Sequence, residues 1–512
     1  MNGHKKLAVT QRRWFLPLLA GLAALLWRLP FVFRYDLYFQ TEGGVYYLMA
    51  KHFLKGEFPT YMWESDYNGT LPQAVVAAFF ALFGSSIALA SFVSTLAYAA
   101  AVAVGVAYLQ RCFKTRAVIV AGIFAVVGVP YALKYTTVPA GSGYDFSLLV
   151  PFLFLWLAIA VYQHGWNFWR ALVAGLLAGH CWYMSKQVLL SFVTIGVVFF
   201  ADVQGRKLLK ELFTTRWLVV VAAAFIVGCL PEIVYKLSHE SKHNLLGIAT
   251  PEQMWTSLYW LCRVVPAYFD GDPLARQPEG VHYLLHGSSE NFPHSAADFI
   301  GIFIAWTVVF HVFRRCTGAW REQNVPVLML AAYPVINMLA VIFSSVAAGE
   351  YYAPKRYLYT SGIILLFWTG IKASECWEKR QFVLAGFLGL LLPISLIHQC
   401  QLLNLPDELR DYRNVVQQLR ENNLHYGVTF YSYAFALTGL SDESLIFGVL
   451  DYNQHESYEH IVAQQDTLAL VYPTGRLAPP DHAAFYNKPF ARVGDPHQAG
   501  ELSWVVYKRA GT

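Results

Sequence analysis

The polar stretch 34–73 contains the residue best placed to do chemistry. Glu42 follows an apolar run that ends at Phe33, and Tyr46, Met49 and Phe53 come after it at spacings that put them on one face of a helix. The spacing predicts a carboxylate beside an interfacial amphipathic helix. That carboxylate could act as a general base, or it could simply favour the N-terminal end of the helix dipole. The spacing alone leaves both alternatives open.

Further charged residues lie at the ends of apolar runs. Asp145 opens one run, Lys186 lies between two others, and the segment GEYYAPKRYLYTSG supplies Glu350, Lys355 and Arg356. Carboxylates can move protons, and lysine and arginine can bind phosphate. The structural alternatives are a helix N-terminal acid for Asp145, a lysine reaching the membrane surface for Lys186 and an interfacial anchor for Arg356.

Composition indicates the elements that must position these residues. The 512 residues are 56% hydrophobic and only 14% charged, whereas soluble domains carry about 25% charged residues. This excludes an ordinary water-soluble protein. The net charge of +5 is small, and the basic residues form short clusters between apolar runs, which argues against nucleic-acid binding.

A membrane-spanning helix needs roughly 20 mostly apolar residues. We predict about eleven crossings and interpret the short apolar stretch 74–83 as a juxtamembrane or re-entrant helix. The crossings are expected near residues 14–33, 87–109, 117–133, 146–162, 171–183, 188–201, 217–235, 299–313, 325–344, 358–371 and 382–398.

The lysines and arginines predict the orientation, because short basic loops stay on the cytoplasmic side. With a cytoplasmic N-terminus, the basic clusters that follow Leu109, Ala201, Phe313 and Ile371 all face the cytoplasm. The larger segments 34–73, 236–297 and the C-terminal part then lie outside.

Two domains follow from this pattern. Residues 1–400 are expected to form an all-α polytopic membrane domain that carries the outer loop 34–73. Residues 401–512 are expected to form a small soluble extracytoplasmic α/β domain, with a helix over 406–422 and strands over 428–435, 467–472 and 503–507.

Short motifs add a resemblance. An acidic residue just after the first span, the segment YNGTLP, and a short apolar helix ending in LFGSS resemble the GT-C superfamily of polyprenyl-phosphate-dependent glycosyltransferases. The likeness points to the branch of lipid A aminoarabinose transferase, with protein O-mannosyltransferases further away. Those enzymes usually have Asp followed by Glu where this chain has Glu42, Gly43 and Gly44.

The resemblance implies roles for individual residues. Glu42 and Asp145 would be catalytic, and Lys186, with Arg356 and Lys355, would bind the donor phosphate. An acceptor or substrate groove would include Tyr46, Tyr67 and Glu350. No cofactor is implied with certainty, and a divalent cation at Asp145 is an open alternative.

The resemblance also implies an activity. The chain would transfer a sugar from a polyprenyl-phosphate donor to a lipid, glycan or protein acceptor outside a bacterial inner membrane, with inversion of the anomeric carbon. Two alternatives stay open, a lipid-linked sugar flippase or transporter, and a non-enzymatic scaffold for envelope assembly. The candidate charges gather in outer loops rather than in a broken-helix pair, which favours the transferase.

Overall fold

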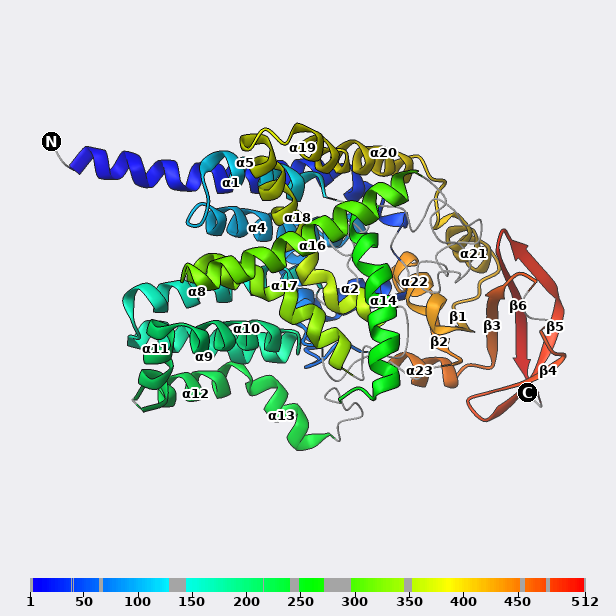
Figure 1. Ribbon diagram of the computed structural model, residues 1–512. Coiled ribbons are helices and arrows are strands. Elements are labelled where there is room, and N and C mark those ends of the chain that lie inside the picture. The colour runs from blue at the N-terminus through cyan, green and yellow to red at the C-terminus, as the bar shows by residue number, and fades with distance from the viewer. Residues whose placement is uncertain are drawn as a thin grey trace. The chain divides into compact units, whose positions relative to one another are not determined.

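The computed structural model describes most of the chain as helices followed by a C-terminal sheet (Figure 1). The described residues are 3–37, 39, 41–63, 68–128, 144–214, 216–239, 248–270, 296–344, 352–451, 456–475 and 479–510. They divide into two compact units. The helical unit comprises the described residues within 1–31, 94–137 and 144–404, and the mixed unit those within 32–93 and 405–512.

Every crossing expected from the sequence coincides with helix in the described residues. Among the described residues, five helical segments are long and apolar enough to cross a membrane, and two bent helix pairs bring the number to as many as seven. Several such helices in one chain indicate a multi-pass membrane protein. The five segments are Trp14–Phe33 in α1 (Gly3–Phe33), α4 (Ile87–Leu109), Ile300–Arg321 in α16 (Ala296–Arg321), α17 (Val325–Phe343), and Phe382–Leu403, which joins α19 (Phe382–Gly389) and α20 (Leu391–Leu403).

Two bent pairs occur among the remaining helices. The bent pairs turn by 116° between α10 and α11 and by 62° between α12 and α13. The predicted crossing 217–235 is therefore a helix broken at Cys229. The helices are α5 (Thr115–Val127), α7 (Tyr144–Ser147), α8 (Leu149–His164), α9 (Phe168–Met184), α10 (Val188–Ala201), α11 (Val203–Thr214), α12 (Arg216–Gly228), α13 (Leu230–Ser238), α14 (Pro251–Asp270) and α18 (Tyr352–Glu378).

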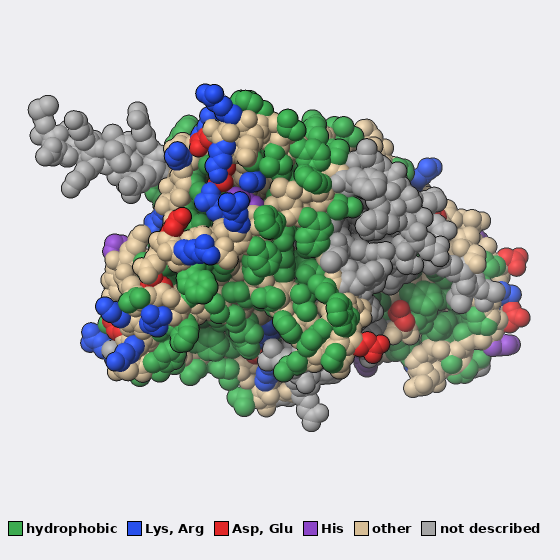
Figure 2. Space-filling view, viewed as in Figure 1, with side chains coloured by type: hydrophobic (Ala, Val, Ile, Leu, Met, Phe, Trp, Pro, Cys, Tyr) green, Lys and Arg blue, Asp and Glu red, His purple; other side chains and the backbone are tan. Residues whose placement is uncertain are grey.

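The helices present apolar side chains outward, as a bilayer requires. On α1, Phe15, Leu18, Leu22 and Leu26 form an exposed stripe along one face. Figure 2 shows hydrophobic side chains covering the helical unit, with Lys and Arg side chains gathered toward one end of it, at the left of the view.

Glycines set the closest helix contact of the helical unit. A Cβ at Gly175 or Gly179 of α9 would lie 2.3 Å and 2.1 Å from the Val221 and Phe225 carbonyl oxygens of α12. Glycines four residues apart let two helix backbones touch, as in membrane helix pairs generally. The C-terminal ends of α9 and α12 are therefore held close together.

The mixed unit joins the first outer segment to the C-terminal residues. It holds α2 (Thr41–Leu54), α3 (Leu71–Phe83) and a six-stranded sheet of order β2-β1-β3-β6-β5-β4. β1, β2 and β3 are parallel, with α22 and α23 as crossovers, and the other strand pairs are antiparallel. The elements are α21 (Arg410–Glu421), β1 (Tyr426–Thr429), α22 (Tyr431–Leu440), β2 (Ile446–Val449), α23 (Glu456–Ala463), β3 (Thr467–Pro473), β4 (His482–Phe485), β5 (Lys488–Ala499) and β6 (Leu502–Arg509).

The expected fold class is confirmed, with one corrected element. The predicted strand 428–435 is wrong, because β1 ends at Thr429 and α22 begins at Tyr431. Ala434, Phe435 and Ala436 are all buried. An apolar run buried on every side gives no periodicity that separates strand from helix.

Candidate functional site

Glu42 lies in the first turn of α2 and is half-buried. Tyr46, one turn later, is fully buried, and Tyr47 beside it is nearly so. Residues 45–50 of α2 are all buried. The predicted interfacial amphipathic helix is therefore wrong, because this part of α2 is packed against protein on every side. The role of Glu42 as a general base remains a prediction.

Gly44, the second residue after Glu42, has a packing reason. A Cβ at Gly44 would lie 2.4 Å from the carbonyl carbon and oxygen of Phe435, which belongs to α22. No side chain fits between two backbones at this separation. Gly44 thus lets α2 lie directly on α22.

Charged residues near the end of α2 pair with a turn of the C-terminal domain. Glu443 accepts hydrogen bonds at 2.8 Å from His52 Nε2, Lys55 Nζ and Tyr458 Oη. Lys51 Nζ lies 3.1 Å from Glu443 and 2.6 Å from Asp442. We call these six residues the Glu443 cluster. Its contacts tie α2 to the residues that follow α22.

The cluster is strained and electrostatically coupled. Asp442 and Glu443 both adopt left-handed backbone conformations, with φ of 56° and 65°, which side chains with a Cβ rarely occupy. Burial opposes the charge on Glu443, but its hydrogen bonds to His52, Lys55, Tyr458 and Lys51 outweigh burial and hold its pKa well below the usual value. Burial likewise opposes charge on His52, yet hydrogen bonds to Glu443 and Glu57 raise its pKa.

A second ion pair fixes the start of the same outer segment. Arg34 donates two hydrogen bonds of 2.9 Å to the Asp36 carboxylate and a third, also 2.9 Å, to the Leu405 carbonyl. Asp36 is buried, and each of its carboxylate oxygens accepts a hydrogen bond from Arg34. This ion pair gives Asp36 a structural role at the start of the segment.

In the helical unit, Lys186 occupies the turn between α9 and α10. Its Nζ donates to the Trp182 carbonyl at 3.0 Å and lies 2.6 Å from Glu232 Oε2, while Lys236 Nζ lies 2.7 Å from the other carboxylate oxygen. Glu232 is only 3% exposed. Two lysines share one buried carboxylate, so this group of three carries one net positive charge.

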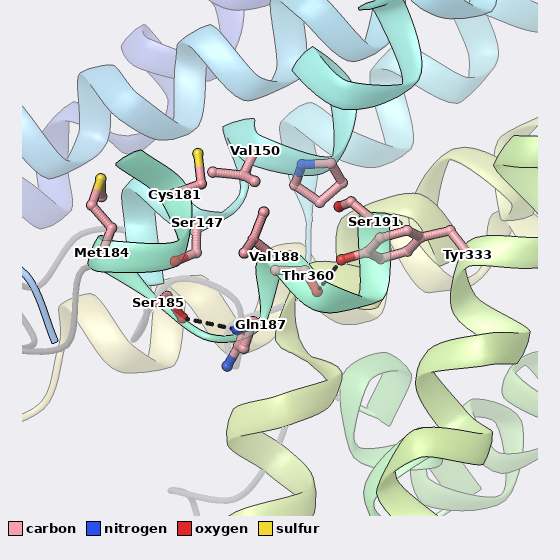
Figure 3. Close-up of a pocket in the computed structure, with 11 residues that line it drawn as sticks. Ser147, Val150, Cys181, Met184, Ser185, Gln187, Val188, Ser191, Tyr333 and Thr360 are labelled. Atoms are coloured by element: carbon pink, nitrogen blue, oxygen red, sulfur yellow. Dashed lines mark hydrogen bonds between the residues drawn. The ribbon is translucent and has the colours of Figure 1, made fainter. Parts of the chain in front are cut away.

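A narrow pocket adjoins Lys186 (Figure 3). Ser185 and Gln187, the chain neighbours of Lys186, line this pocket. Ser147 of α7, Tyr333 of α17 and Thr360 of α18 line it as well. The described part of this lining contains hydroxyl groups, one amide and apolar side chains. The Tyr333 hydroxyl donates to Thr360 Oγ1 at 3.1 Å.

Three chain segments that contain predicted site residues meet at this pocket. Asp145 precedes Ser147 by two residues, Lys186 separates Ser185 from Gln187, and Arg356 precedes Thr360 by one helical turn of α18. Segments far apart in the sequence thus converge at one place. Lys355 lies in the same first turns of α18. The side chains of Asp145, Lys355 and Arg356, and all of Tyr67 and Glu350, lie outside the described residues.

Sequence reasoning missed Glu232 and the Glu443 cluster. Glu232 had a signal, because it is a carboxylate inside the apolar run 217–235, and an acid in such a run needs a nearby cation. No sequence signal pointed to the pairing of Glu443 with His52, because 391 residues separate them and neither belongs to a motif. Among the described residues, no group of three or more His, Cys, Asp or Glu could hold a metal ion.

The fold is similar to that of solved membrane glycosyltransferases, and it is the fold that the resemblance in the sequence predicts. At 10–12% identity this likeness establishes the architecture, and the residue roles remain predictions.

Individual solved structures show how far the likeness extends. ArnT from Cupriavidus metallidurans in the apo state covers 98% of this chain and is itself covered to 98%, at 11% identity and a TM-score of 0.53. The same protein bound to undecaprenyl phosphate gives 12% identity, 95% and 97% coverage, and a TM-score of 0.51. The Archaeoglobus fulgidus oligosaccharyltransferase gives 10% identity and a TM-score of 0.52, covering 90% of this chain and 69% of its own. No family model and no curated protein matches the sequence.

Proposed function

We propose that this protein is a membrane glycosyltransferase that moves a sugar from a polyprenyl-phosphate donor to an acceptor on the extracytoplasmic face of a bacterial inner membrane. The observation that carries the proposal is the pocket beside Lys186, at which the chain near Asp145, Lys186 and Arg356 converges within a GT-C fold. Support for the donor class comes from the similar fold of a protein solved with undecaprenyl phosphate.

The proposed reaction is a single displacement. The acceptor hydroxyl oxygen attacks the anomeric carbon, and the bond from that carbon to the phosphate oxygen breaks with its electrons going to the phosphate. Glu42 takes the hydroxyl proton, and Lys186, with Arg356 and Lys355, stabilises the growing charge on the phosphate. One displacement inverts the anomeric configuration.

The other predicted residues complete the proposal. Asp145 would orient the acceptor or hold a divalent cation, and Tyr67 and Glu350 would line the acceptor groove. Tyr46, which was also expected in the groove, is fully buried in α2, so it would instead support the helix that carries Glu42. The acceptor is a lipid, a glycan or a protein.

Replacing Glu42 by Gln tests the mechanism. The amide keeps the size of the side chain but cannot take a proton, so sugar transfer from a synthetic polyprenyl-phosphate sugar should fall by about 10² to 10⁴. Expression and donor binding should be retained. Glu421→Gln, at an exposed helix end of the mixed unit, is the matched control.

Three results would redirect the proposal. Wild-type transfer rates in Glu42→Gln would leave Glu42 a helix-terminus charge and move the search for the base to Asp36, Asp145 or Glu350. Absent transfer by the wild-type protein, with movement of lipid-linked sugar across vesicle membranes, would favour the flippase alternative. If the wild-type protein shows neither sugar transfer nor movement of lipid-linked sugar, the scaffold alternative would be favoured.

A further inference from the structure

The helix α11 carries a row of basic residues on its outer face. Arg206, Lys207 and Lys210 are exposed, whereas Gly205 and Leu208 are buried against the rest of the helical unit. Figure 2 shows Lys and Arg side chains gathered over α11, at the left of the view. The proposed mechanism gives this row no task.

This helix runs across the end of α10. It turns by 116° from α10, which is one of the predicted crossings, so α11 extends roughly along the membrane surface. A Cβ at Gly205 would lie 2.4 Å from the Phe199 carbonyl oxygen, so α11 packs directly on the last turns of α10. The Gly205 amide donates to Asp202 Oδ2 at 2.8 Å, which caps the first turn of α11. The bend is therefore fixed by packing and by a helix cap.

Local contacts occupy one acid and one base of α11. Glu211 accepts a hydrogen bond of 3.2 Å from an indole of α12. The Nη1 atom of Arg206 donates at 3.0 Å to a carbonyl in the last turn of α10. Lys207 and Lys210 are exposed and three residues apart, which puts them on the same side of the helix. The outer face of α11 therefore presents two ammonium groups to whatever covers it.

Apolar side chains are exposed beside these lysines. On α11, Phe213 is 64% exposed and Val203 is 51% exposed. Trp166 Nε1 donates to the Leu208 carbonyl at 3.1 Å, so the turn before α9 lies beside α11, and Trp169 in the first turn of α9 is 68% exposed. Aromatic side chains next to lysines are typical of the layer where lipid headgroups meet acyl chains. A soluble acidic partner would match the charges but would offer no acyl chains to the aromatic rings.

We propose that α11 binds the anionic headgroups of membrane phospholipids, with Lys207 and Lys210 as the contacting residues. Each lysine near a membrane surface contributes about a fivefold preference for anionic lipid. Lys186 precedes the first residue of α10 and α11 follows the last, so this surface lies at the opposite end of α10 from the proposed donor site. With the predicted orientation it faces the cytoplasmic leaflet. The inference rests on the membrane-spanning architecture and does not depend on sugar transfer.

Titration of phosphatidylglycerol into the purified full chain in neutral detergent tests the inference. Hydrogen exchange of α11 reports binding at this helix and yields the dissociation constant, and phosphatidylcholine with the same acyl chains is the comparison lipid. Phosphatidylglycerol should slow exchange of α11 at lower concentrations than phosphatidylcholine does. Lys207→Gln and Lys210→Gln should each raise the dissociation constant for phosphatidylglycerol about fivefold, and the double variant about 25-fold. Raising the ionic strength from about 0.1 M to about 1 M should also weaken binding.

Two control variants isolate the effect of charge. Lys207→Arg combined with Lys210→Arg keeps both charges and should bind phosphatidylglycerol as the wild type does. Lys508→Gln removes one charge from an exposed position of β6 in the mixed unit and should leave the dissociation constant unchanged. Because all of these side chains are exposed, the variants should unfold at the wild-type temperature in the absence of lipid.

Four results would overturn the proposal. Equal dissociation constants for the two lipids would remove the headgroup preference, and wild-type binding by the double Gln variant would remove the two lysines from the contact. Protection of α11 by glycerol phosphate at the same concentration would show a site for a small anion instead of a lipid surface. Tighter binding of soluble polyglutamate than of phosphatidylglycerol would favour an acidic protein as the partner. A wild-type protein that binds phosphatidylglycerol at α11 but transfers no sugar would refute the proposed function alone.

Discussion

At the scale of single residues, the ammonium group of Lys186 has one carboxylate partner in the structure and a second, competing partner in the proposed mechanism. In the structure it pairs with Glu232, and the proposed donor phosphate would need the same ammonium group. Lys236 already contacts the second oxygen of Glu232, so the carboxylate keeps a cation when Lys186 turns away. The three residues thus allow a phosphate to bind without leaving Glu232 unpaired.

A pair of substitutions should separate these two roles of Lys186. Lys186→Met should slow sugar transfer by about one to two orders of magnitude and destabilise the fold by about 1–3 kcal/mol, because it removes a phosphate ligand and half of a buried pair. Lys186→Met combined with Glu232→Gln should regain stability without regaining activity. Unfolding midpoints and transfer rates measure the two effects. Recovery of transfer in the double variant would mean that Lys186 serves only to neutralise Glu232.

At residue level, Lys186 and Asp145 were predicted from the resemblance of their segments to the GT-C superfamily. Both have chain neighbours at the pocket, and their roles remain predictions. The pocket lining could not be predicted, because Tyr333 and Thr360 are hydroxyl residues within ordinary spans. Their meaning depends on which helices touch, and no local pattern encodes that.

At the scale of elements, α2 and α22 pack backbone to backbone at Gly44. Gly44→Ala should destabilise the protein by about 1–3 kcal/mol, since the new Cβ meets the Phe435 carbonyl, which cannot move without shifting α22. Gly196→Ala is the control, because Gly196 is also helical and has open space at its Cβ position. It should be neutral or stabilise the protein slightly. Equal unfolding midpoints for both variants would refute the close contact.

The Glu443 cluster should make the docking of α2 depend on pH. His52 has a pKa raised above 6.5, so its contribution is complete below pH 6.5 and is lost as pH rises through the raised pKa. Glu443 has a lowered pKa, so its contribution is complete above pH 4.5 and is lost only as pH falls through that lowered value. The groups facing His52 are Glu57, Glu443 and Tyr458, with Lys51 and Lys55 bound to the same carboxylate.

Hydrogen exchange of α2 measures this dependence. Protection should be greatest between about pH 4.5 and 6.5 and should decline above it, after correction for the intrinsic exchange rate. His52→Gln should flatten the decline, whereas His425→Gln, at an exposed position, should leave it unchanged. A decline of the same size in His52→Gln would assign it to another group.

The elements were predicted well where length and hydropathy decide them. The long spans and strands β3 and β6 follow from apolar runs of the right length. The bends at Asp202 and Cys229 were missed because each lies within or beside a continuous apolar run. The helix α22 was missed because a fully buried run carries no period.

At the scale of the whole molecule, the membrane orientation remains a prediction. A reporter that is active only outside the cytoplasm, fused after Thr512, should be active, because the predicted crossings are odd in number and basic residues crowd the opposite loops. The same reporter placed in the basic loop after Ile371 should be silent. Activity of a cytoplasm-only reporter at the C-terminus would reverse the topology and the face on which transfer is proposed.

The sequence predicted the whole molecule in outline. Composition established a membrane protein, and short motifs led to the GT-C fold. The grouping of the first outer segment with the C-terminal domain in one unit could not be foreseen, because it rests on long-range pairs such as Arg34 with Leu405. The domain boundary at residue 400 and the extracytoplasmic position of 401–512 remain predictions.

The glycine contact between α9 and α12 sets where the two helices end relative to each other. α9 ends at Met184 and α12 ends at Gly228, and Lys186 and Glu232 follow these helix ends by a few residues. The contact at Gly179 and Phe225 therefore helps to place the lysine beside the carboxylate. One residue inserted after Gly179 would rotate the end of α9 by about 100° and displace the turn that carries Lys186, although no polar atom had been changed.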